Sequence, residues 1–361
     1  MSERDGGSSP LPAAPALEGA QRTRWLRLIQ TVGPLLALFL IFALFAALAP
    51  ESFPATGNLE TIARQTAIVG IGALGMTLII IMGGIDLSAG STVALSTVVI
   101  AWILQRGADA GWLGLGRGAE QVGLWPIAWP LLAALGGVLV GALCGMVNGL
   151  LITGLRMVPF IVTLGMLLIV RGVAKGLAHE QKIDAPASWL RGILASLEPQ
   201  ERWMLVPPGV WIMILLALLV AGLLLYTPLG RHIFAVGSNE QTARLCGVRV
   251  GRVKVIVYTL GAACAGLAGV MQFSRLTVGD PTVAVGLELD IIAAVVIGGG
   301  SLSGGEGSVL GTLVGALIMT TIRSGCTHMG LPNWVQEIVA GAIIVVAVAL
   351  DRMRQRVAME R

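Results

Sequence analysis

The chain has 361 residues, of which 55% are hydrophobic and 12% charged, and its mean hydropathy is +0.85. A soluble protein carries about 25% charged residues, so this composition excludes a soluble globular protein and indicates an integral membrane protein. The net charge of +4 comes from basic residues beside apolar segments, a pattern of membrane flanks and not of a nucleic-acid-binding surface.

Taken in chain order, residues 1–27 predict a cytoplasmic tail, disordered over its Gly-, Ser-, Pro- and Ala-rich part. The uncharged segment 28–49 is longer than the apolar region of a signal peptide, about 7–15 residues, so we interpret it as an uncleaved span. Further apolar segments follow at 61–82, 87–104, 127–153, 158–178, 209–227, 252–274, 287–299, 306–324 and 334–350.

These segments predict an all-α membrane protein with about ten transmembrane helices in one polytopic domain at residues 28–352, followed by a cytoplasmic tail at 353–361. Segment 287–299 is short for a bilayer and predicts a half-helix or a re-entrant element. Arginines gather at the N-terminal tail, at 154–157, at 228–251 and at the C-terminus. By the positive-inside rule, these regions and both termini are cytoplasmic.

A repeated motif divides the chain into two related halves. "GGIDLSAG" at 83–90 and "GGGSLSGG" at 298–305 each follow an apolar segment and precede another one. In transporters built from duplicated halves, Gly-interrupted helices in corresponding positions point to the solute path. The motifs do not decide whether the repeats are parallel or inverted.

Asp86 is a carboxylate in a strongly apolar region, where an ionised group costs roughly 2.5–3.5 kcal/mol on insertion scales. One interpretation is a structural N-cap, since Asp accepts hydrogen bonds from the first N–H groups of a helix. A second is that Asp86 borders a polar path or gate, and a third is a tight cytoplasmic turn. The candidate path residues are Asp86, Ser88, Gln65, Asn148, Ser301 and Ser303.

Loop 228–251 contains "SNEQTARLCG", in which Ser238 and Gln241 form a capping-box pattern and Gly247 occupies the position of a C-terminal cap. This pattern predicts a helix of about two turns, which is marginal in water unless it docks on a surface. It is either a partner-docking helix or an ordinary connector. The candidate docking residues are Ser238, Asn239, Glu240, Gln241, Ala243, Arg244 and Gly247.

Charged residues also gather at the predicted outer end, near the start of segment 287–299. Ion pairing between Arg275 and an acid is one interpretation, and contact with a solute or an outer partner is the other. The residues concerned are Arg275, Asp280, Glu288 and Asp290.

Several function classes lack their motifs. No G-x-x-x-x-G-K-[S/T] is present, so the chain does not bind ATP through a P-loop. No ladder of intramembrane carboxylates or arginines suggests a proton relay, and no nucleophile–base set or metal-ligand spacing suggests an enzyme. Four scattered cysteines and three scattered histidines predict neither disulfides nor a metal centre, and we expect no cofactor.

Four segments together resemble one family: "GMTLIIIMGGIDLSAGS", "LGRHIFAVGSNEQTARLCGVRVGRVKVIVY", "GLELDIIAAVVIGGGSLSGGEGSVLGTLVGALI" and "VALDR". They are similar, in the same order, to the membrane permeases of ribose, xylose and arabinose ABC importers. The resemblance implies a bacterial inner-membrane permease that moves a monosaccharide, such as the pentoses xylose or ribose, by alternating access.

The resemblance also implies the partners of the chain. They are a second permease copy in a homodimer, an ATPase subunit with two nucleotide-binding domains, and a periplasmic or extracellular sugar-binding protein, all around a membrane lipid environment without nucleic acid. Residues 238–247 match the coupling helix of the family. The outer loop 179–208 lacks the Gly/Ser-rich pattern of ribose permeases. The alternatives are an ion-coupled secondary sugar transporter and a membrane scaffold without a solute.

Overall fold

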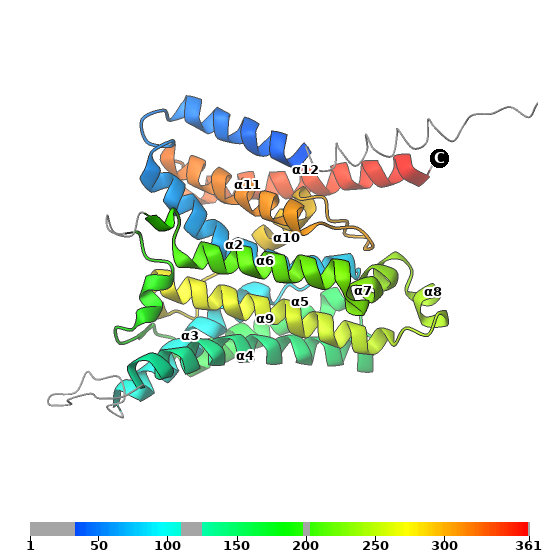
Figure 1. The fold of residues 1–361 in the computed structure, drawn as a ribbon, viewed down its shortest axis with the longest axis horizontal. Helices are drawn as coiled ribbons and strands as arrows, with labels where there is room; N and C mark the ends of the chain where they lie inside the picture. The colour runs from blue at the N-terminus through cyan, green and yellow to red at the C-terminus, as the bar shows by residue number, and fades with distance from the viewer. Residues whose placement is uncertain (1–32, 110–124, 198–202, 360–361) are drawn as a thin grey trace, which may run out of the picture.

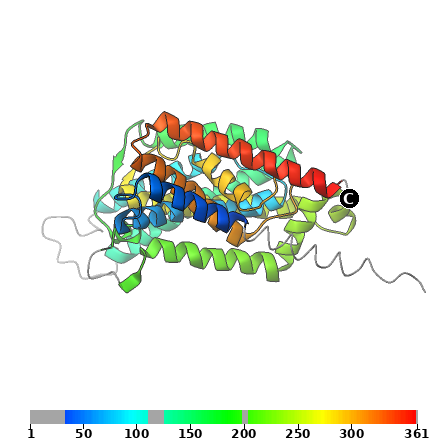
Figure 2. The ribbon, with the colours of Figure 1, turned by 90° about the horizontal axis from the view of Figure 1, so that it is seen from above.

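The computed structural model describes residues 33–109, 125–197 and 203–359, and it is a bundle of helices that run roughly side by side (Figures 1 and 2). The predicted tail 1–27 and the first residues of segment 28–49 lie outside the described residues. The first described helix is Gly33–Leu48. The helices that follow are α2 (Thr56–Ile81), α3 (Ala89–Asp109), α4 (Trp125–Gly154), α5 (Pro159–Leu177), α6 (Pro208–Tyr226), α7 (Pro228–Ser238), α8 (Glu240–Leu245), α9 (Val250–Leu276), α10 (Leu287–Ile297), α11 (Val309–His328) and α12 (Asn333–Met359).

The chain is helical, as predicted, and each expected apolar segment coincides with a helix. Among the described residues, however, 7 helices are long and apolar enough to cross a membrane: α2, α3, α4, α5, α6, α9 and α11. Helix Gly33–Leu48 and the apolar part of α12, Asn333–Ala349, are shorter. The 11-residue α10 is also too short, in agreement with the expected half-helix.

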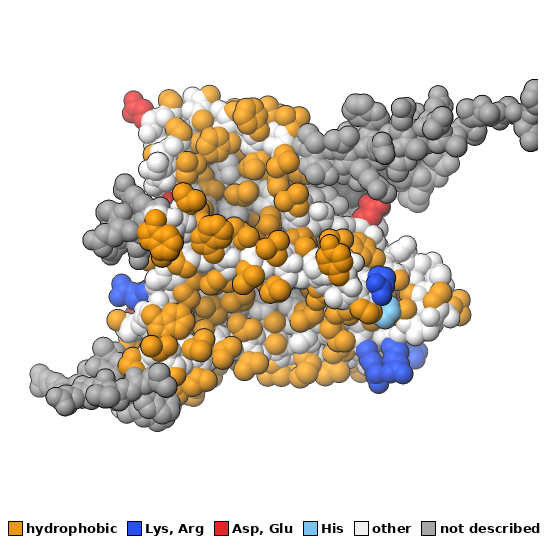
Figure 3. Space-filling view, in the orientation of Figure 1, with side chains coloured by type: hydrophobic (Ala, Val, Ile, Leu, Met, Phe, Trp, Pro, Cys, Tyr) orange, Lys and Arg blue, Asp and Glu red, His pale blue; other side chains and the backbone are white. Residues whose placement is uncertain are grey.

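Helix α2 is the centre of the bundle, because every residue from Thr66 to Ile81 is buried. It packs against α6, α9, α10 and α11. In contrast, α6 exposes Leu215, Leu218, Leu219 and Leu225 and forms a peripheral helix whose outer face suits lipid. Apolar side chains cover the face shown in Figure 3, as expected for a surface in a bilayer.

Glycines permit close packing of α4 on α9. A Cβ on Gly141 would lie 2.5 Å from the Ala262 carbonyl oxygen, and one on Gly145 would lie 2.1 Å from the Tyr258 carbonyl oxygen. Glycines at every fourth position let two backbones approach in a membrane, where van der Waals packing replaces the hydrophobic drive. The close packing that the glycine content indicated is therefore present along this helix pair.

Two short elements lie at the end of the bundle opposite α8. A two-stranded antiparallel pair joins β1 (Ile183–Asp184) to β2 (Val278–Gly279), and the 3-10 helix η1 (Trp189–Ile193) follows β1. The sequence did not predict these strands. At the other end lie α7 and α8, which contact each other, and, apart from them, the C-terminal part of α12 (Figure 1).

Candidate functional site

The buried carboxylate of Asp86 lies in a break between α2 and α3. Gly83, with φ +85°, ends α2: its N–H donates to the Ile80 carbonyl, and the N–H of Gly84 donates to the Ile79 carbonyl. This is the glycine-dependent reversal common at helix ends. The chain then turns into α3, which begins at Ala89.

Asp86 forms a local turn and is not the N-cap of α3. Its Oδ1 accepts the backbone N–H of Ser88 at 2.8 Å and the Ser88 hydroxyl at 2.5 Å. Because α3 starts at Ala89, Ser88 and not Asp86 holds the N-cap position immediately before the helix. The carboxylate instead fixes the backbone that leads into α3, as short polar side chains do in Asx-turns.

Asn148 joins this break from α4. Its Nδ2 donates to Ser88 Oγ at 3.0 Å and lies 3.5 Å from Asp86 Oδ1. Asp86 is 1% exposed and both partners are fully buried. None of the described Lys or Arg side chains forms an ion pair with Asp86. The three predicted path residues therefore form one buried polar cluster, whereas Gln65 lies elsewhere.

The second motif repeats the local geometry. Gly299, with φ +93°, follows α10, and the N–H of Gly300 donates to the Val295 carbonyl. Ser301 Oγ accepts the backbone N–H of Ser303 at 3.2 Å, the counterpart of the Asp86–Ser88 bond. The two glycine caps, Gly83 and Gly299, are one residue further apart in sequence than the two turn residues, Asp86 and Ser301. The likeness is therefore local and does not establish two related halves.

The two motifs contact each other. The N–H of Gly305 donates to the Ile81 carbonyl at 2.8 Å, and a Cβ on Gly304 would lie 3.0 Å from the Cα of Gly83. Helix α7 closes over both, since a Cβ on Gly237 would overlap the Ile81 carbonyl oxygen and lie 2.7 Å from the nitrogen of Gly305. The sequence repeat thus marks a real junction, at which α7 also packs.

A polar cavity of about 280 Å³ lies between α2, α9, α10 and α11, toward the end opposite α8. It is close in size to the smallest ligand pockets, which start at about 300 Å³. Its polar lining residues are Gln65, Gln272, Arg275, Asp290, Thr320, Arg323, Thr327 and Gln336. The structure therefore brings together one predicted path residue and two predicted outer residues that are far apart in sequence.

The ion pair in this cavity differs from the expected one. Asp290 pairs with Arg323 of α11 at 2.7 Å, whereas Arg275 forms no ion pair with any of the described residues. Arg275 lies in the last turn of α9 and lines the same cavity. Sequence reasoning missed Arg323, because it lies within the apolar segment 306–324 and far in sequence from Asp290.

Asp280 and Glu288 lie beside the cavity, and neither lines it. Asp280 Oδ1 accepts the N–H and hydroxyl of Thr282, and Oδ2 pairs with Lys182 at 3.2 Å. Burial raises the pKa of Asp280, but the Thr282 hydrogen bonds and the Lys182 ammonium outweigh it, so the pKa lies below its ordinary value. Glu288 Oε1 accepts the N–H of Gly286. Both carboxylates organise their own loop.

At the other end of the bundle, the predicted loop 228–251 contains two helices. Ser238 is the last residue of α7, so it cannot cap the next helix as expected. Asn239 is the N-cap instead, because its Oδ1 accepts the N–H of Thr242 at 2.9 Å. Gly247, with φ +85°, follows α8 in the predicted C-terminal position. Helix α8 has 6 residues, fewer than the two turns expected.

The faces of α8 differ in accessibility. Ala243 is 4% exposed, and Glu240 pairs with Arg244 at 3.1 Å and with Lys254 of α9 at 2.8 Å. Its hydrogen bond with Lys254 holds the pKa of Glu240 below the ordinary value, against the opposing effect of burial. Through the buried Ala243 and the Glu240–Lys254 pair, α8 packs against the rest of the chain. The outward face carries Leu245, 88% exposed, which sequence reasoning did not select.

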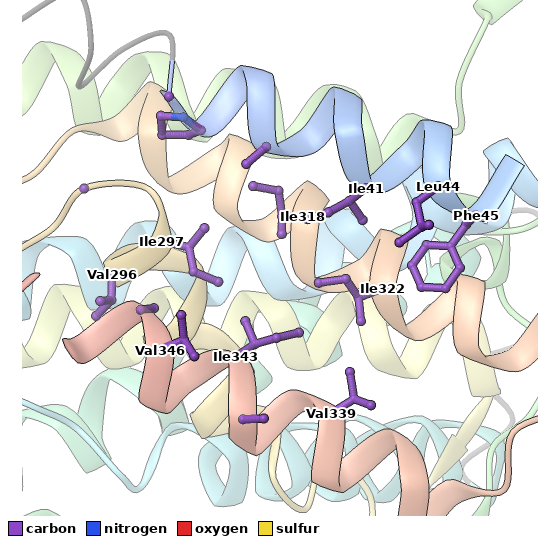
Figure 4. A pocket seen from close by; sticks show the side chains of 16 residues that line it. Ile41, Leu44, Phe45, Val296, Ile297, Ile318, Ile322, Val339, Ile343 and Val346 are labelled. Carbon is purple, nitrogen blue, oxygen red and sulfur yellow. The ribbon is translucent and has the colours of Figure 1, made fainter. Parts of the chain in front are cut away.

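An apolar pocket differs in character from these sites. It measures about 590 Å³ and lies between Gly33–Leu48, α10, α11 and α12, with Ile41, Phe45, Ile318 and Ile343 pointing into it (Figure 4). All of its described lining residues carry apolar side chains. It offers no side-chain hydrogen bond to a polar solute and suits hydrocarbon.

The comparisons with known proteins cover nearly the whole chain. Residues 58–348 match the family model described as the permease component of branched-chain amino acid transport systems. The chain is 37% identical to the ribose import permease protein RbsC of Escherichia coli K12, covering 89% of this chain and 93% of that protein.

Two further relatives are also sugar import permeases. RbsC of Bacillus subtilis is 38% identical, covering 90% of this chain and 94% of its own length. The fructose import permease protein FrcC of Rhizobium meliloti is 35% identical, covering 90% of this chain and 86% of its own length. No solved structure matches the chain.

Proposed function

The chain belongs to this family of ABC-importer permease components, and from that premise we propose that it carries a monosaccharide of the ribose class across the inner membrane. It is a transport subunit and not an enzyme, and an ABC importer implies a separate ATPase and a sugar-binding protein. The observation that carries the substrate class is the extensive identity to permeases named for ribose and fructose.

The polar cavity supports a neutral polyhydroxylated solute. Its polar side chains are amides, hydroxyls and guanidinium groups, with the single carboxylate of Asp290 paired with Arg323. Sugar hydroxyls both donate and accept hydrogen bonds, and this lining offers both kinds of partner. We place Gln65, Gln272 and Arg275 on the outer part of the path. Asp86, Ser88 and Asn148, in the break between helices, lie on its inner part or hold its wall.

The test is uptake of labelled ribose into proteoliposomes that contain the permease, its ATPase and its binding protein. We expect concentrative uptake that needs ATP and survives a protonophore, whereas an ion-coupled carrier would lose uptake with the ion gradient. The permease alone should concentrate nothing.

Gln272→Leu should lower uptake at least about tenfold, the effect of losing one or two hydrogen bonds to a solute. Gln105→Leu, on the exposed surface of α3, is the matched control. Uptake by the lone subunit would refute the assignment.

We propose that α8 docks on the ATPase through Leu245 and the exposed neighbours Gln241 and Thr242. A partner that covers this face of α8 would remove the apolar side chain of Leu245 from water, which favours binding. Leu245→Glu should reduce copurification of the ATPase. Leu205→Glu is the control, because Leu205 is 81% exposed at the other end of α6. Equal copurification of the ATPase with both variants would count against this surface.

We also propose that both termini and α8 face the cytoplasm and that two copies form a homodimer. Cys246, next to α8, is exposed, and Cys144, Cys264 and Cys326 are buried, so one native thiol reports the orientation. A membrane-impermeant maleimide should label inverted vesicles and spare intact spheroplasts, and Cys246→Ser should abolish labelling. Labelling in spheroplasts would reverse the orientation.

A further inference from the structure

A second, strongly basic cavity lies at the α8 end of the bundle. It measures about 760 Å³ and is formed by the end of α4, by α8 and by the beginning of α9. Its charged lining residues are Arg156, Glu240, Arg244, Arg249, Arg252 and Lys254. Five cations and one carboxylate leave four positive charges unbalanced among these residues. The docking residues proposed above, Gln241, Thr242 and Leu245, do not line this cavity.

Three of the cations have no partner of their own. Glu240 is paired with Arg244 and Lys254, whereas Arg156, Arg249 and Arg252 make no ion pair or side-chain hydrogen bond with another described residue. All three side chains are exposed, so solvent screens part of their mutual repulsion, and a bound anion would relieve the remainder. The first turn of α9 adds to the positive potential, because its N-cap Arg249 provides no side-chain acceptor for the free N–H groups.

The edge of this cavity is apolar. Arg156 lies in the turn between α4 and α5 with φ +53°, flanked by Leu155, 64% exposed, and Met157, 40% exposed. Val158 and Phe160 continue the exposed apolar surface onto α5. A soluble acidic partner would cover the cations and leave these side chains without an apolar contact. A phospholipid covers both, since its headgroup is anionic and its acyl chains extend along the helix surface.

From this combination we propose that the cavity binds the headgroup of an anionic phospholipid, with the phosphate among Arg156, Arg249 and Arg252 and the acyl chains along the α4–α5 turn. Basic pockets at the cytoplasmic ends of transmembrane helices suit such headgroups. The bound lipid would neutralise the charge beside α8 and fill the space between α8 and α4. The site concerns the membrane environment, so it holds for any transported solute.

The test is a titration of the purified full-length chain in neutral detergent with phosphatidylglycerol and, separately, phosphatidylcholine, read by native mass spectrometry. Wild type should bind phosphatidylglycerol in preference. Each cation near an anionic lipid surface strengthens attraction roughly fivefold, so R156Q/R252Q should weaken this binding roughly 20- to 30-fold. The control variant is K175Q/R231Q, which removes two exposed charges outside the cavity and should leave binding unchanged.

Further measurements distinguish a bound phospholipid from inorganic phosphate and from a contact with the ATPase. If inorganic phosphate at millimolar concentration displaces phosphatidylglycerol, the site is a general phosphate site and the lipid assignment is wrong. If R156Q/R252Q binds both lipids as wild type does, the cavity holds no lipid. If the variant retains lipid and loses only the ATPase, the cations form a protein contact. Unchanged melting temperature of the variant shows that a lost preference is not unfolding.

Discussion

Replacement of Gly145 by alanine tests the packing that positions the buried polar cluster. A Cβ at Gly145 would lie 2.1 Å from the Tyr258 carbonyl oxygen and 2.6 Å from the Ala262 Cβ. Carbon atoms in contact stay about 3.5–4.0 Å apart, so α4 must move from α9 by on the order of 1 Å. Overpacking of this kind costs about 1–3 kcal/mol. Asn148 lies one turn further along α4, and the same movement draws its Nδ2 away from Ser88.

Gly222→Ala is the matched control, because a Cβ at Gly222 on α6 meets nothing within 4 Å. Both variants gain about 0.5–1 kcal/mol of helix propensity, so their difference isolates the steric cost of about 1–3 kcal/mol. At about 2–4 °C per kcal/mol for a protein of moderate size, Gly145→Ala should melt at least about 2 °C below Gly222→Ala.

The assay is the apparent melting temperature of the full-length chain in detergent, measured by size-exclusion after heating. Uptake of ribose should fall with Gly145→Ala and remain with Gly222→Ala. If Gly145→Ala melts at or above the control, the close approach of α4 and α9 is not the packing that the structure describes, and the positioning of Asn148 by it fails too.

Three other predictions concern the polar groups. Asp86→Ala should leave assembly intact and lower uptake, because it removes the acceptor for the buried N–H of Ser88, whereas Asp86→Asn keeps that acceptor and should retain more; wild-type uptake by the alanine variant would contradict this. Arg323→Met should destabilise the chain, by less than the 3–5 kcal/mol of a fully buried pair because Arg323 is 37% exposed, and adding Asp290→Asn should restore stability in a double-mutant cycle. The Lys254 hydrogen bond lowers the pKa of Glu240 below its ordinary value of 4.5. The pair therefore contributes its full stability at a pH above 4.5, and this contribution is lost as the pH falls through the lowered pKa. Glu240→Gln lacks this contribution and should lose less melting temperature than wild type between pH 6 and pH 3.

The apolar segments were readable from sequence because a membrane helix carries its own signal. Length and hydropathy alone located α2 to α6 and α9 to α12, and the short α10 was recognised by its length. Helix α7 was missed since its signal is of another kind: Thr227 caps it by accepting the Gly230 N–H, and Pro228 occupies its first turn. This Thr-Pro pattern is present in the sequence directly after the apolar helix α6.

The neighbouring cap shows how two correct local patterns compete. Ser238 and Asn239 are both good N-caps, and the sequence pattern with Gln241 favoured Ser238. Ser238 is already the last residue of α7, so Asn239, in an extended conformation with φ −158°, turns the chain into α8. The existence of a preceding helix decides the register, and no local pattern within 238–247 contains that information.

The outer cavity was beyond sequence reasoning for a different reason. Gln65, Gln272, Asp290 and Arg323 come from four helices, and their approach depends on how the helices pack. Arg275 was the cation nearest in sequence to the acids, yet the partner of Asp290 lies on α11. Nearness in sequence predicts pairs within one helix or loop, whereas pairs between membrane helices follow the bundle geometry.

Helix α9 connects the three polar regions of the molecule. Near its beginning Lys254 pairs with Glu240 of α8. About one turn later the Tyr258 hydroxyl lies 3.4 Å from the Ile85 carbonyl beside Asp86, and in the last turn Arg275 lines the outer cavity. A helix of 27 residues is about 40 Å long and moves as one body when its packing allows. Glycine-mediated contact with α4 leaves little space for α9 to bend. If α8 docks on the ATPase as proposed, the pair of Glu240 with Lys254 would connect that partner to α9, whereas the exposed Leu245 would contact only the partner.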